Sequence, residues 1–484
     1  MTEPLIYEKS LPGRSAYSLP PLDVPLDTSE VGTYLRSHEV PLPEMSENEV
    51  VRHFIRLSRH NFHVDLGFYP LGSCTMKYNP KINEEVASLP GFTRLHPFQD
   101  LSDAQGILAV MYHLQEALKA ISGLDAVSLQ PAAGAQGELA GILIIREYHR
   151  QRGELNQRQE VLIPDSAHGT NPATASLAGF RAVSVRSNAQ GQIDLEDLQG
   201  KLSDRTAGMM ITNPNTLGIF EEHIQEICRL VHQVGGLVYM DGANMNALMG
   251  LAKPAHMGFD LMHFNLHKTF STPHGGGGPG SGPVAVRSAL SEFLPGYIVT
   301  TSPDGYSLKR PSHSIGDLHG FYGNVGMMIR ALAYIWYHGG DGLAEVTQHA
   351  IVNANYLYHH LREVLDVMYP TPSVMHECVL SAQSLKKATG ITTFDIAKRL
   401  IDYGVHPPTI YFPLIVPEAL MIEPTETEPR ERLDQFIKAI RRIVEEAHQT
   451  PEVVKKAPHT TPTRRLDDAH AARHINVCCF VESE

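Results

Sequence analysis

A single lysine followed by a glycine-rich run is the most distinctive chemical feature of the sequence. Lys268 follows an apolar stretch that we predict to be a strand, and His274 and four consecutive glycines come shortly after it. A lysine in a partly desolvated pocket loses proton affinity, so its amine can form a Schiff base with a carbonyl compound. On residue type alone, a lysine that snorkels at a strand end is commoner. The role of Lys268 therefore depends on its neighbours.

Two further features lie upstream of this lysine. Asp241 ends the apolar run 237–241, which brings a carboxylate to the same predicted sheet edge. Between Gln130 and Glu138 a predicted strand passes through a glycine-bearing turn into a helix, whose first N–H groups could hold a phosphate. Each feature alone is weak, since terminal aspartates are usually caps and such turns are usually only turns. Together, a phosphate cradle, an acid and a lysine are the groups that hold pyridoxal phosphate.

The chemistry of that cofactor gives each group a role. Its ring accepts electrons only while the ring nitrogen stays protonated, and Asp241 would hold that proton. Lys268 would form the Schiff base. After another predicted strand, His168 could stack on the ring and Thr170 could reach the ring hydroxyl group.

The glycine run also contains a formal G-x-G-x-x-G match, at Gly275, Gly277 and Gly280. A dinucleotide-binding fingerprint must open a helix, whereas Pro279 and Pro283 interrupt this segment and a strand-like run follows. We interpret the run as a loop that passes close to a ligand or a neighbouring subunit. We predict no metal site, because neither a C-x-x-C nor an H-E-x-x-H spacing occurs in the sequence.

Alternating strands and helices are predicted to position these groups. Their order between residues 101 and 290 indicates a mostly parallel sheet with right-handed crossovers, in which ligands bind at the carboxyl ends of the strands. The strand-like runs 260–266 and 283–286 are joined by a loop, so an irregular or antiparallel addition should end the sheet. The other predicted strands are 126–130, 161–164, 182–186, 208–212 and 237–241.

Helical periodicity marks the flanking elements. Ser102 to Gln105 reads as a capping box that starts an amphipathic helix of about five turns. A second clear helix covers 221–234. The C-terminal part shows a predicted strand at 375–381 and helical patterns at 326–338, 342–365, 393–403 and 428–448.

These patterns predict the division of the chain. Seven prolines among the first 45 residues deny that segment long helices and indicate an extended arm. We expect an N-terminal arm and helical segment at 1–100, a large cofactor-binding domain at 101–325, a small C-terminal α/β domain at 326–450 and a tail at 451–484.

Composition excludes several classes of protein. The 484 residues carry 53 acidic and 40 basic side chains, and this net charge of -13 excludes a strongly basic nucleic-acid binder. The 42% apolar and 19% charged residues are typical of a globular protein. No run approaches the roughly 18 to 20 apolar residues of a membrane span, and the N-terminus lacks a secretory or transit signal. We expect a soluble, cytoplasmic protein with no nucleic-acid or membrane partner.

Five sequence blocks carry a family resemblance. Through them the chain resembles the P-protein family of the glycine cleavage system, glycine dehydrogenase (decarboxylating). The resemblance implies a fold-type I, aspartate aminotransferase-like large domain that binds pyridoxal 5′-phosphate, plus a smaller C-terminal α/β domain. The lysine block resembles the second of two paralogous subunits. The blocks are Leu71–Lys77, Ala167–Pro172, Thr212–Gly218, Asn265–Phe270 and His406–Pro413.

The resemblance also implies roles for individual residues. Lys268 and His168 would be catalytic, with His168 stacked on the ring and Ala243 packed against its opposite face. Asp241 would bind the ring nitrogen. By analogy with other fold-type I enzymes, Asn215 could lie near the ring hydroxyl group, as could Thr170. The residues expected to reach the phosphate are Ala135, Gln136 and His267.

The reaction and the partners are implied in the same way. Glycine would displace Lys268 from the cofactor and lose carbon dioxide, and the remaining aminomethyl group would pass to the lipoyl arm of the H-protein. Two copies of the chain would assemble with two copies of the paralogous subunit 1.

Two alternatives stay open. Another fold-type I enzyme that acts on a small amino acid, such as an aminotransferase or a cysteine desulfurase-like lyase, would need the same cofactor groups. The second alternative is a cofactor-free subunit that only supports a catalytic paralogue. The intact lysine block argues against this alternative. Cys74 lies in a matching block and could line the site, or could pack as a small buried hydrophobe.

Overall fold

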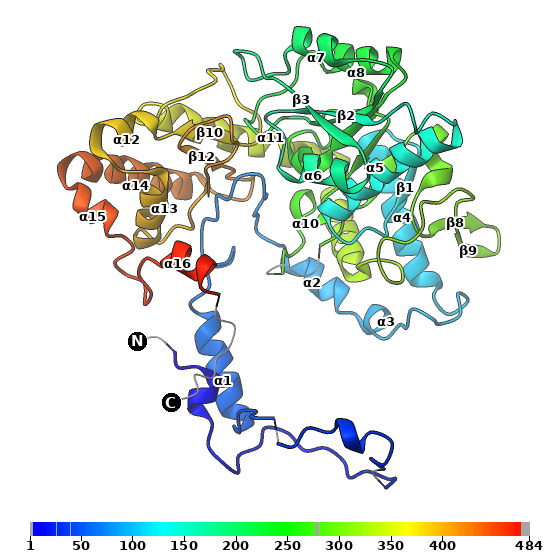
Figure 1. Cartoon of the computed structure of the whole chain (residues 1–484), viewed down its shortest axis with the longest axis vertical. Coiled ribbons are helices and arrows are strands. Elements are labelled where there is room, and N and C mark those ends of the chain that lie inside the picture. Colours follow the sequence, from blue (N-terminus) through cyan, green and yellow to red (C-terminus); the bar gives the residue numbers. More distant parts are fainter. Residues whose placement is uncertain (1–2, 26, 39, 276–279, 476–484) are drawn as a thin grey trace. The chain divides into compact units, whose positions relative to one another are not determined.

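Runs of mostly buried residues form a central sheet of seven strands in this computed structural model (Figure 1). The strand order is β1-β7-β6-β5-β4-β2-β3. The pairs among β2 to β6 are parallel, whereas β7 is antiparallel to both β6 and β1. The predicted mostly parallel sheet with an antiparallel addition is confirmed. The strands are β1 Ala126–Ser128, β2 Glu160–Pro164, β3 Arg181–Val185, β4 Thr206–Thr212, β5 Leu237–Asp241, β6 Leu261–His263 and β7 Val284–Val286.

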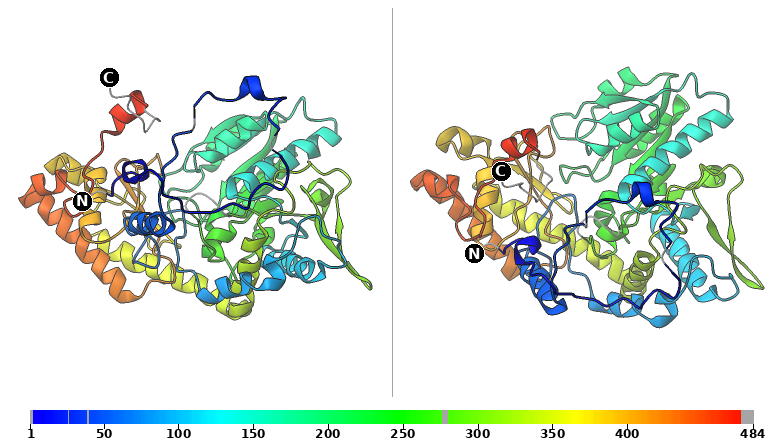
Figure 2. Two further views of the ribbon diagram at one scale, coloured as in Figure 1. Left: turned by 90° about the horizontal axis from the view of Figure 1, so that it is seen from below. Right: turned by 60° about the horizontal axis from the view of Figure 1, so that its bottom comes forward.

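Helices cover both faces of this sheet (Figure 2), because successive side chains of a strand point to opposite faces. In β5, Val238 and Met240 pack with α4, α7 and α8, whereas Leu237 and Tyr239 pack with α5 and α6. A strand buried on both faces reads as a continuous apolar run, which is why β5 is visible in the sequence. The helices are α4 Gln105–Ser122, α5 Gly134–Gln151, α6 Thr170–Leu177, α7 Leu195–Lys201 and α8 Ile224–Gln233.

The start of α4 differs from the prediction. The helix has 18 residues, so its length of about five turns is confirmed, but the residue before it is Ala104 and no side chain caps it. The predicted capping box at Ser102 to Gln105 is wrong. The Gln105 side chain turns instead to the hairpin strand β9 (Gly305–Lys309), where its amide donates to the Tyr306 carbonyl and its oxygen accepts from the Tyr306 N–H.

A long helix, α11 Val325–Leu361, links the large sheet to a second core. Gly339, in the left-handed region at a φ of 63°, breaks it, so the two predicted helical patterns form one interrupted element. Its first half packs in the core of the large sheet and its second half in a separate core. That core contains a sheet of order β10-β12-β11, with β10 Cys378–Ser381, β11 Thr409–Ile410 and β12 Ala419–Ile422, and the helices α12 Gln383–Thr389, α13 Thr393–Asp402, α14 Arg430–Gln449 and α15 Pro451–Lys455.

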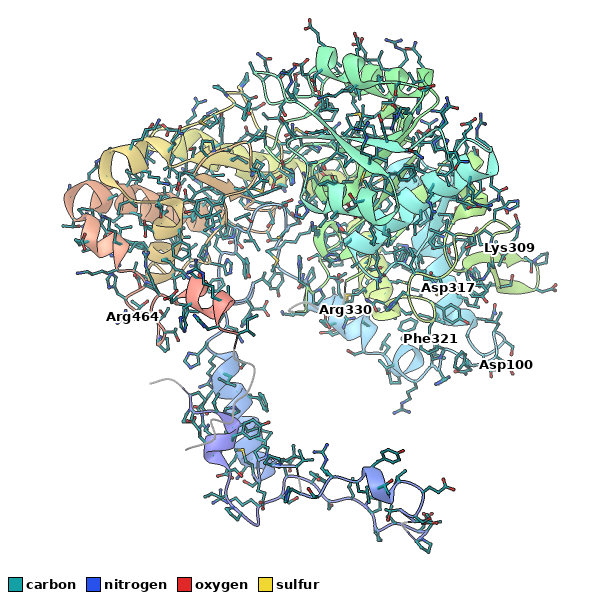
Figure 3. The ribbon with its side chains drawn as sticks, viewed as in Figure 1. Asp100, Lys309, Asp317, Phe321, Arg330 and Arg464 are labelled. Carbon is teal, nitrogen blue, oxygen red and sulfur yellow. The ribbon has the colours of Figure 1, made fainter. Side chains whose placement is uncertain are left out.

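Polar contacts fasten the peripheral segments to this framework. Arg330 on α11 forms a two-pronged ion pair with Glu84, with both N–O distances at 2.7 Å, and so holds α2 (Lys81–Ala87). Asp317 accepts from the Gln130 amide at 2.8 Å, which fixes the segment after β9 beside the end of β1 (Figure 3). The remaining elements are α3 Pro90–Thr93, α9 Pro254–Met257, α10 Leu266–Thr269, β8 Ile298–Ser302, β9 Gly305–Lys309, η3 Gly242–Ala247 and η4 Ser288–Phe293.

The elements above belong to one unit, residues 67–457, and a second unit contains residues 1–66 and 458–484. The second unit holds α1 Glu47–Ser58, α16 Asp468–Arg473, η1 Ile6–Lys9 and η2 Gly32–Tyr34. Residues 3–25, 27–38, 40–275 and 280–475 are described by the structure. Most of the predicted glycine loop, including Gly277, lies outside them. Within these ranges no helix is long and apolar enough to cross a membrane.

Candidate active site

A cavity of about 280 Å³ lies where the parallel strands end. Its walls come from the ends of β4, β5 and β6, from the turns after β1 and β2, and from the segment around Ser73. Seven of the residues predicted from the sequence line it: Ala135, His168, Thr170, Asp241, Ala243, His267 and Lys268. The other lining residues are Ser73, Ala133, Gly134, Glu138, Thr212, Thr216, His263 and Asn265.

Lys268 reaches the cavity from a helix and not from a strand. The strand β6 ends at His263, and Lys268 lies in the one-turn helix α10. The predicted strand 260–266 is therefore too long. It stops early because the Asn265 carbonyl accepts from the N–H groups of Lys268 and Thr269, which turns the chain into a helix. The Lys268 ammonium group donates to the Ser73 carbonyl at 2.8 Å.

Asp241 provides a buried carboxylate in the same cavity. The side chain is 5% exposed, and its oxygens accept from the Ala243 N–H at 3.0 Å and the Asn171 amide at 3.2 Å. Burial raises the pKa of Asp241, but the neighbouring His263, the Ala243 hydrogen bond and the Lys268 charge outweigh burial and hold the pKa below its ordinary value. Asp241 is therefore ionised at neutral pH.

Glu138, on the first turns of α5, is a second buried carboxylate that sequence reasoning missed. Burial, and then the charge of Asp241, raise its pKa to about 7. Its Oε2 accepts from the Thr170 hydroxyl at 2.9 Å, whereas its Oε1 is buried without a hydrogen-bond partner among the residues that the structure describes. Two adjacent carboxylates thus differ in charge below about pH 7, with the proton on Glu138.

His168 and Thr170 follow β2 and line the same cavity as this carboxylate pair. Nδ1 of His168 is 2.9 Å from the Thr170 hydroxyl and accepts from the Thr170 N–H at 3.2 Å. Partial desolvation lowers the pKa of His168, so the imidazole is neutral at neutral pH. Phe412, from the His406–Pro413 block, stands edge-on to this ring with the centroids 5.5 Å apart.

The N-terminus of α5 forms one wall of the cavity. The first N–H groups of a helix have no partner within the helix and attract anions. A side chain at Gly134 would collide with the Asn265 amide, so only glycine lets this turn approach α10 so closely. His267 stands opposite, where its Nδ1 accepts from the Ser281 N–H at 3.3 Å. Burial, His274 and Lys268 lower the pKa of His267 to about 3, which leaves a neutral ring whose Nε2–H can donate.

Two predicted residues do not line the cavity. The Gln136 side chain turns back within its own turn, where its oxygen accepts from the Ala132 N–H at 2.8 Å. The Asn215 amide donates to the Gly191 carbonyl at 2.8 Å, and its oxygen accepts from the N–H groups of Leu217 and Ile219. Cys74 does not line the cavity either, and burial raises the pKa of its thiol.

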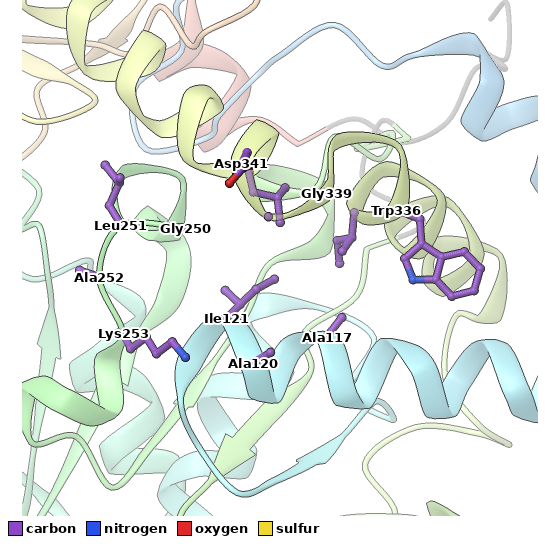
Figure 4. Close-up of a pocket in the computed structure, with 13 residues that line it drawn as sticks. Ala117, Ala120, Ile121, Gly250, Leu251, Ala252, Lys253, Trp336, Gly339 and Asp341 are labelled. Carbon is purple, nitrogen blue, oxygen red and sulfur yellow. The ribbon is translucent and has the colours of Figure 1, made fainter.

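A larger cavity of about 650 Å³ lies elsewhere, between α4, the segment 250–253 and the break in α11 (Figure 4). Small and apolar side chains such as Ala117, Ala120 and Ile121 form most of its wall. The charged side chains among its lining residues are Lys253 and Asp341. No residue predicted for the site lines it, so its size alone does not make it the reaction site.

Several lining residues carried no predicted role. Ser73, Thr212, Thr216 and Asn265 lie inside the sequence blocks that carry the family resemblance, so the blocks were the available signal. His263 lies in β6, and its Nδ1 is hydrogen-bonded to the Tyr239 hydroxyl. No local pattern marks it as a site residue, since it reads as part of an apolar strand.

Family comparisons cover most of the chain. The family described as "Glycine cleavage system P-protein" matches residues 28–309, and "Glycine dehydrogenase, C-terminal domain" matches residues 346–461. The probable glycine dehydrogenase (decarboxylating) subunit 2 of Chloroherpeton thalassium is 56% identical, over 99% of this chain and 98% of that protein. The protein of the same description from Caldanaerobacter subterraneus subsp. tengcongensis is 55% identical, with 97% of both chains covered.

Solved structures agree on the fold. A crystal structure of glycine decarboxylase (P-protein) in inhibitor-bound form is 20% identical, with a TM-score of 0.72 over 86% of this chain and 94% of that chain. A cysteine desulfurase from Escherichia coli is 16% identical, with a TM-score of 0.61 over 79% of this chain and 95% of that chain. These likenesses confirm the fold-type I architecture. By sequence, the chain belongs to the glycine cleavage system P-protein family, as a glycine dehydrogenase (decarboxylating) subunit 2.

Proposed function

We propose that the chain binds pyridoxal 5′-phosphate beside Lys268 and uses it for the decarboxylation step of the glycine cleavage system. Glycine loses its carboxylate as carbon dioxide, and the aminomethyl group passes to the lipoyl arm of the H-protein. One observation carries the proposal: Lys268, Asp241 and the N-terminus of α5 all open into one cavity of about 280 Å³.

The polar groups of the cavity fit this cofactor. Its phosphate matches the N-terminus of α5 and the neutral donor of His267, its ring nitrogen matches the ionised Asp241, and its aldehyde matches the Lys268 amine. Buried lining atoms without a protein partner indicate that a polar group belongs there, since such atoms are costly to bury unpaired. They are Glu138 Oε1, Thr212 Oγ1 and Asn265 Oδ1.

Each side chain then has a physical task. When bound, the cofactor supplies an electron sink for the bond that breaks at the glycine carbon. Asp241 stays ionised, so it can keep a proton on a ring nitrogen. His168 stays neutral, so its ring can stack without adding charge, and Ala243 is small enough to let a ring lie close. The amine of Lys268 attaches the cofactor. When this amine is not attached, it donates a hydrogen bond to the Ser73 carbonyl.

The assembly follows from membership in the two-chain form of the family. A subunit 2 has a subunit 1 as its partner. We further propose two copies of each chain in the complex, docking of the lipoylated H-protein, and a cytoplasmic location. Size-exclusion chromatography with light scattering on the co-expressed subunits tests the stoichiometry, and a complex of one copy each would contradict it.

The experiment that tests the function compares Lys268→Ala with the matched control Lys253→Ala. Lys253 lines the larger cavity, so its loss should leave the cofactor absorbance band and the activity unchanged. Lys268→Ala should lose the visible absorbance band of the lysine-bound cofactor. Activity is measured as exchange of the glycine carboxyl carbon with bicarbonate in the presence of lipoylated H-protein. Transamination without this exchange would favour another fold-type I reaction, and an absent band in the wild-type complex would favour a supporting subunit.

A further inference from the structure

The segment Leu71–Lys77 is held in an unusual backbone conformation against the candidate site. Ser73 and Thr75 have φ angles of 62° and 48°, in the left-handed region that side chains other than glycine rarely adopt. Gly72 has no room for a side chain, because a Cβ would lie 2.6 Å from the Met421 carbonyl oxygen. Such strain persists only where the surroundings impose it, so the contacts of this segment carry information about its purpose.

Two fully buried glutamates provide the main contacts. Glu377 Oε2 accepts from the Ser73 N–H at 2.8 Å. Glu423 accepts from the Thr75 N–H at 2.9 Å and from the Thr75 hydroxyl at 2.6 Å. Both glutamates are 0% exposed. Each of the two left-handed residues is therefore bound through its N–H by a carboxyl group.

The small sheet explains why the two glutamates lie together. Glu377 directly precedes β10 and Glu423 directly follows β12, and the neighbouring residues Cys378 and Ile422 are paired in the antiparallel register. The two strands thus deliver two carboxyl groups to one end of the sheet. Beyond them, Lys77 forms a buried ion pair with Glu426 at 2.9 Å, which fixes the far end of the segment.

The held segment also contacts Lys268, the candidate nucleophile. The Ser73 residue whose N–H binds Glu377 offers its carbonyl to the Lys268 ammonium group at 2.8 Å. A continuous path of hydrogen bonds therefore runs from the small sheet through Ser73 to the amine in the cavity. The glutamates themselves do not line that cavity. Glu377 acts on the amine through Ser73, and Glu423 holds Thr75, two residues further along the same segment.

We propose that Glu377 and Glu423 are positioning residues for Lys268, which fix the Ser73 carbonyl as the resting acceptor of its ammonium group. The importance of this for catalysis rests on the proposed function of Lys268 in cofactor attachment, whereas the path of contacts does not. A rigid acceptor holds the unattached amine at one place beside the cavity. It also withdraws the amine from solvent.

The charge on the pair is consistent with this role. Burial and the charge of Glu423 raise the pKa of Glu377 well above its usual range, and burial raises that of Glu423 to about 7. Glu377 therefore carries a proton at neutral pH, while Glu423, with two donors from Thr75, is the better site for negative charge. A glutamine should replace a protonated Glu377 with little loss, because its amide oxygen still accepts from the Ser73 N–H.

His376 completes a group with the composition of a metal site, since ligand atoms of these three residues lie within 4.8 Å of one another. Its Nε2 is 3.9 Å from each carboxyl group, beyond hydrogen-bonding distance. Ser73 and Thr75 already donate to Glu377 Oε2 and to both oxygens of Glu423, and the Asn244 amide lies 3.5 Å from Glu377 Oε1. We therefore assign the pair to the segment and not to an ion.

The test measures how easily the Lys268 amine reacts. The full chain, assembled with subunit 1 and freed of cofactor, is treated briefly with acetic anhydride, and the modification of Lys268 is compared by peptide mass spectrometry with that of the exposed Lys309 in the same molecule. Glu377→Leu and Glu423→Leu should raise the relative rate at Lys268 about tenfold, which corresponds to about 1.4 kcal/mol. Glu377→Gln should stay within about twofold of the wild-type rate, as isosteric rescue requires.

The matched control is Glu221→Leu. Glu221 is also a buried glutamate, 1% exposed, that accepts a backbone N–H, that of Ile193 at 2.9 Å, but it has no contact with the held segment. It should lower thermal stability and leave the Lys268 rate unchanged. An equal rate increase in the control would overturn the proposal, because it would reflect general loosening. So would unchanged labelling in folded Leu variants, or a stoichiometric metal ion that Glu377→Gln removes.

The two proposals can fail separately. If the wild-type complex takes up no pyridoxal phosphate, the proposed function fails, yet the tenfold difference in labelling still supports the positioning pair. If the cofactor binds and the labelling does not change, only the positioning pair fails.

Discussion

Two pairs of buried carboxyl groups lie near Lys268, and they differ in what they face. Asp241 and Glu138, at the large sheet, line the cavity and differ in charge because their pKa values are moved apart. Glu377 and Glu423, at the small sheet, are closed off from the cavity and accept from backbone N–H groups. The first pair is placed to act on a ligand, and the second to hold the protein that surrounds it.

The comparison shows that a perturbed pKa alone does not identify a catalytic group. Burial raises the pKa of Glu138 and of Glu423 to about 7 in both cases. The two glutamates differ in the hydrogen bonds of their carboxyl oxygens. Glu138 Oε1 has no partner among the described residues, whereas both oxygens of Glu423 accept from Thr75. An unpartnered atom that lines a cavity is thus the better indication of a ligand.

The largest expected effect comes from Asp241→Asn. The neutral amide cannot hold a proton on a ring nitrogen, so glycine–bicarbonate exchange should fall by roughly 10²- to 10³-fold, the usual cost of losing one electrostatic contact to the transition state. Glu221→Gln is the control, a buried carboxylate outside the cavity, and should keep near wild-type exchange. Equal losses in both variants would erase the distinction between cavity-facing and enclosed groups.

A smaller effect is expected from Glu138→Gln, and it depends on pH. The pKa of Glu138 is raised from 4.5 to about 7, so its contribution to the free energy of unfolding is complete below about pH 4.5 and is lost as the pH rises through about 7. The glutamine variant should lack this loss, a difference of roughly 3 kcal/mol at most. Denaturant titrations at several pH values measure it.

A control sharpens this second prediction. Burial also raises the pKa of Glu221 to about 7, so Glu221→Gln should flatten the pH dependence of stability in the same direction. Only Glu138→Gln should also shift the pH dependence of the cofactor absorbance, because only Glu138 shares the cavity with Asp241. If the pH dependence of the cofactor absorbance shifted in both variants, a carboxyl group outside the cavity would affect the cofactor as much as Glu138 does, which would contradict the prediction.

Asn215→Ala should affect stability and not the cofactor. Its side chain makes two hydrogen bonds to the backbone of its own loop and one to the Gly191 carbonyl, and it does not line the cavity. The variant should therefore lose about 1 to 3 kcal/mol of unfolding free energy. The affinity for pyridoxal phosphate should change less than about threefold. Fluorescence titration measures that affinity. A tenfold weakening would contradict the prediction and indicate that Asn215 contacts the cofactor.

The smallest effect is expected from Gln136→Ala. Its side chain accepts one backbone N–H. The helix terminus binds an anion through the backbone N–H of residue 136, and the alanine variant keeps that group. Phosphate-dependent cofactor affinity should therefore stay within about twofold of wild type. Gly134→Ala provides the contrast, since a Cβ there would collide with Asn265 and should weaken binding strongly.

The sequence made the large sheet predictable because its strands are buried on both faces. The runs that became β2, β4 and β5 are mainly apolar and buried along their whole length, and their order with intervening helices indicates parallel pairing. Local polar groups were less predictable. The capping box at Ser102 failed because Gln105 found partners in β9, about two hundred positions along the chain.

The candidate site was predictable where its residues end strands or start helices, as Asp241 and Ala135 do. Glu138 was not, because a glutamate in the first turns of a helix is usually a solvated residue. Glu377 and Glu423 were not, because only the antiparallel pairing of β10 with β12 brings them together. Their partners, Ser73 for Glu377 and Thr75 for Glu423, lie more than about three hundred positions away, a separation that no local pattern reveals.

Reduction of the bound cofactor tests directly whether Lys268 is the amine that attaches it. The assembled wild-type complex, loaded with pyridoxal phosphate, is reduced with borohydride and mapped by peptide mass spectrometry. We expect the added pyridoxyl mass on Lys268 in nearly every modified chain. Modification of another lysine, such as Lys77 or Lys253, with Lys268 unmodified, would contradict it.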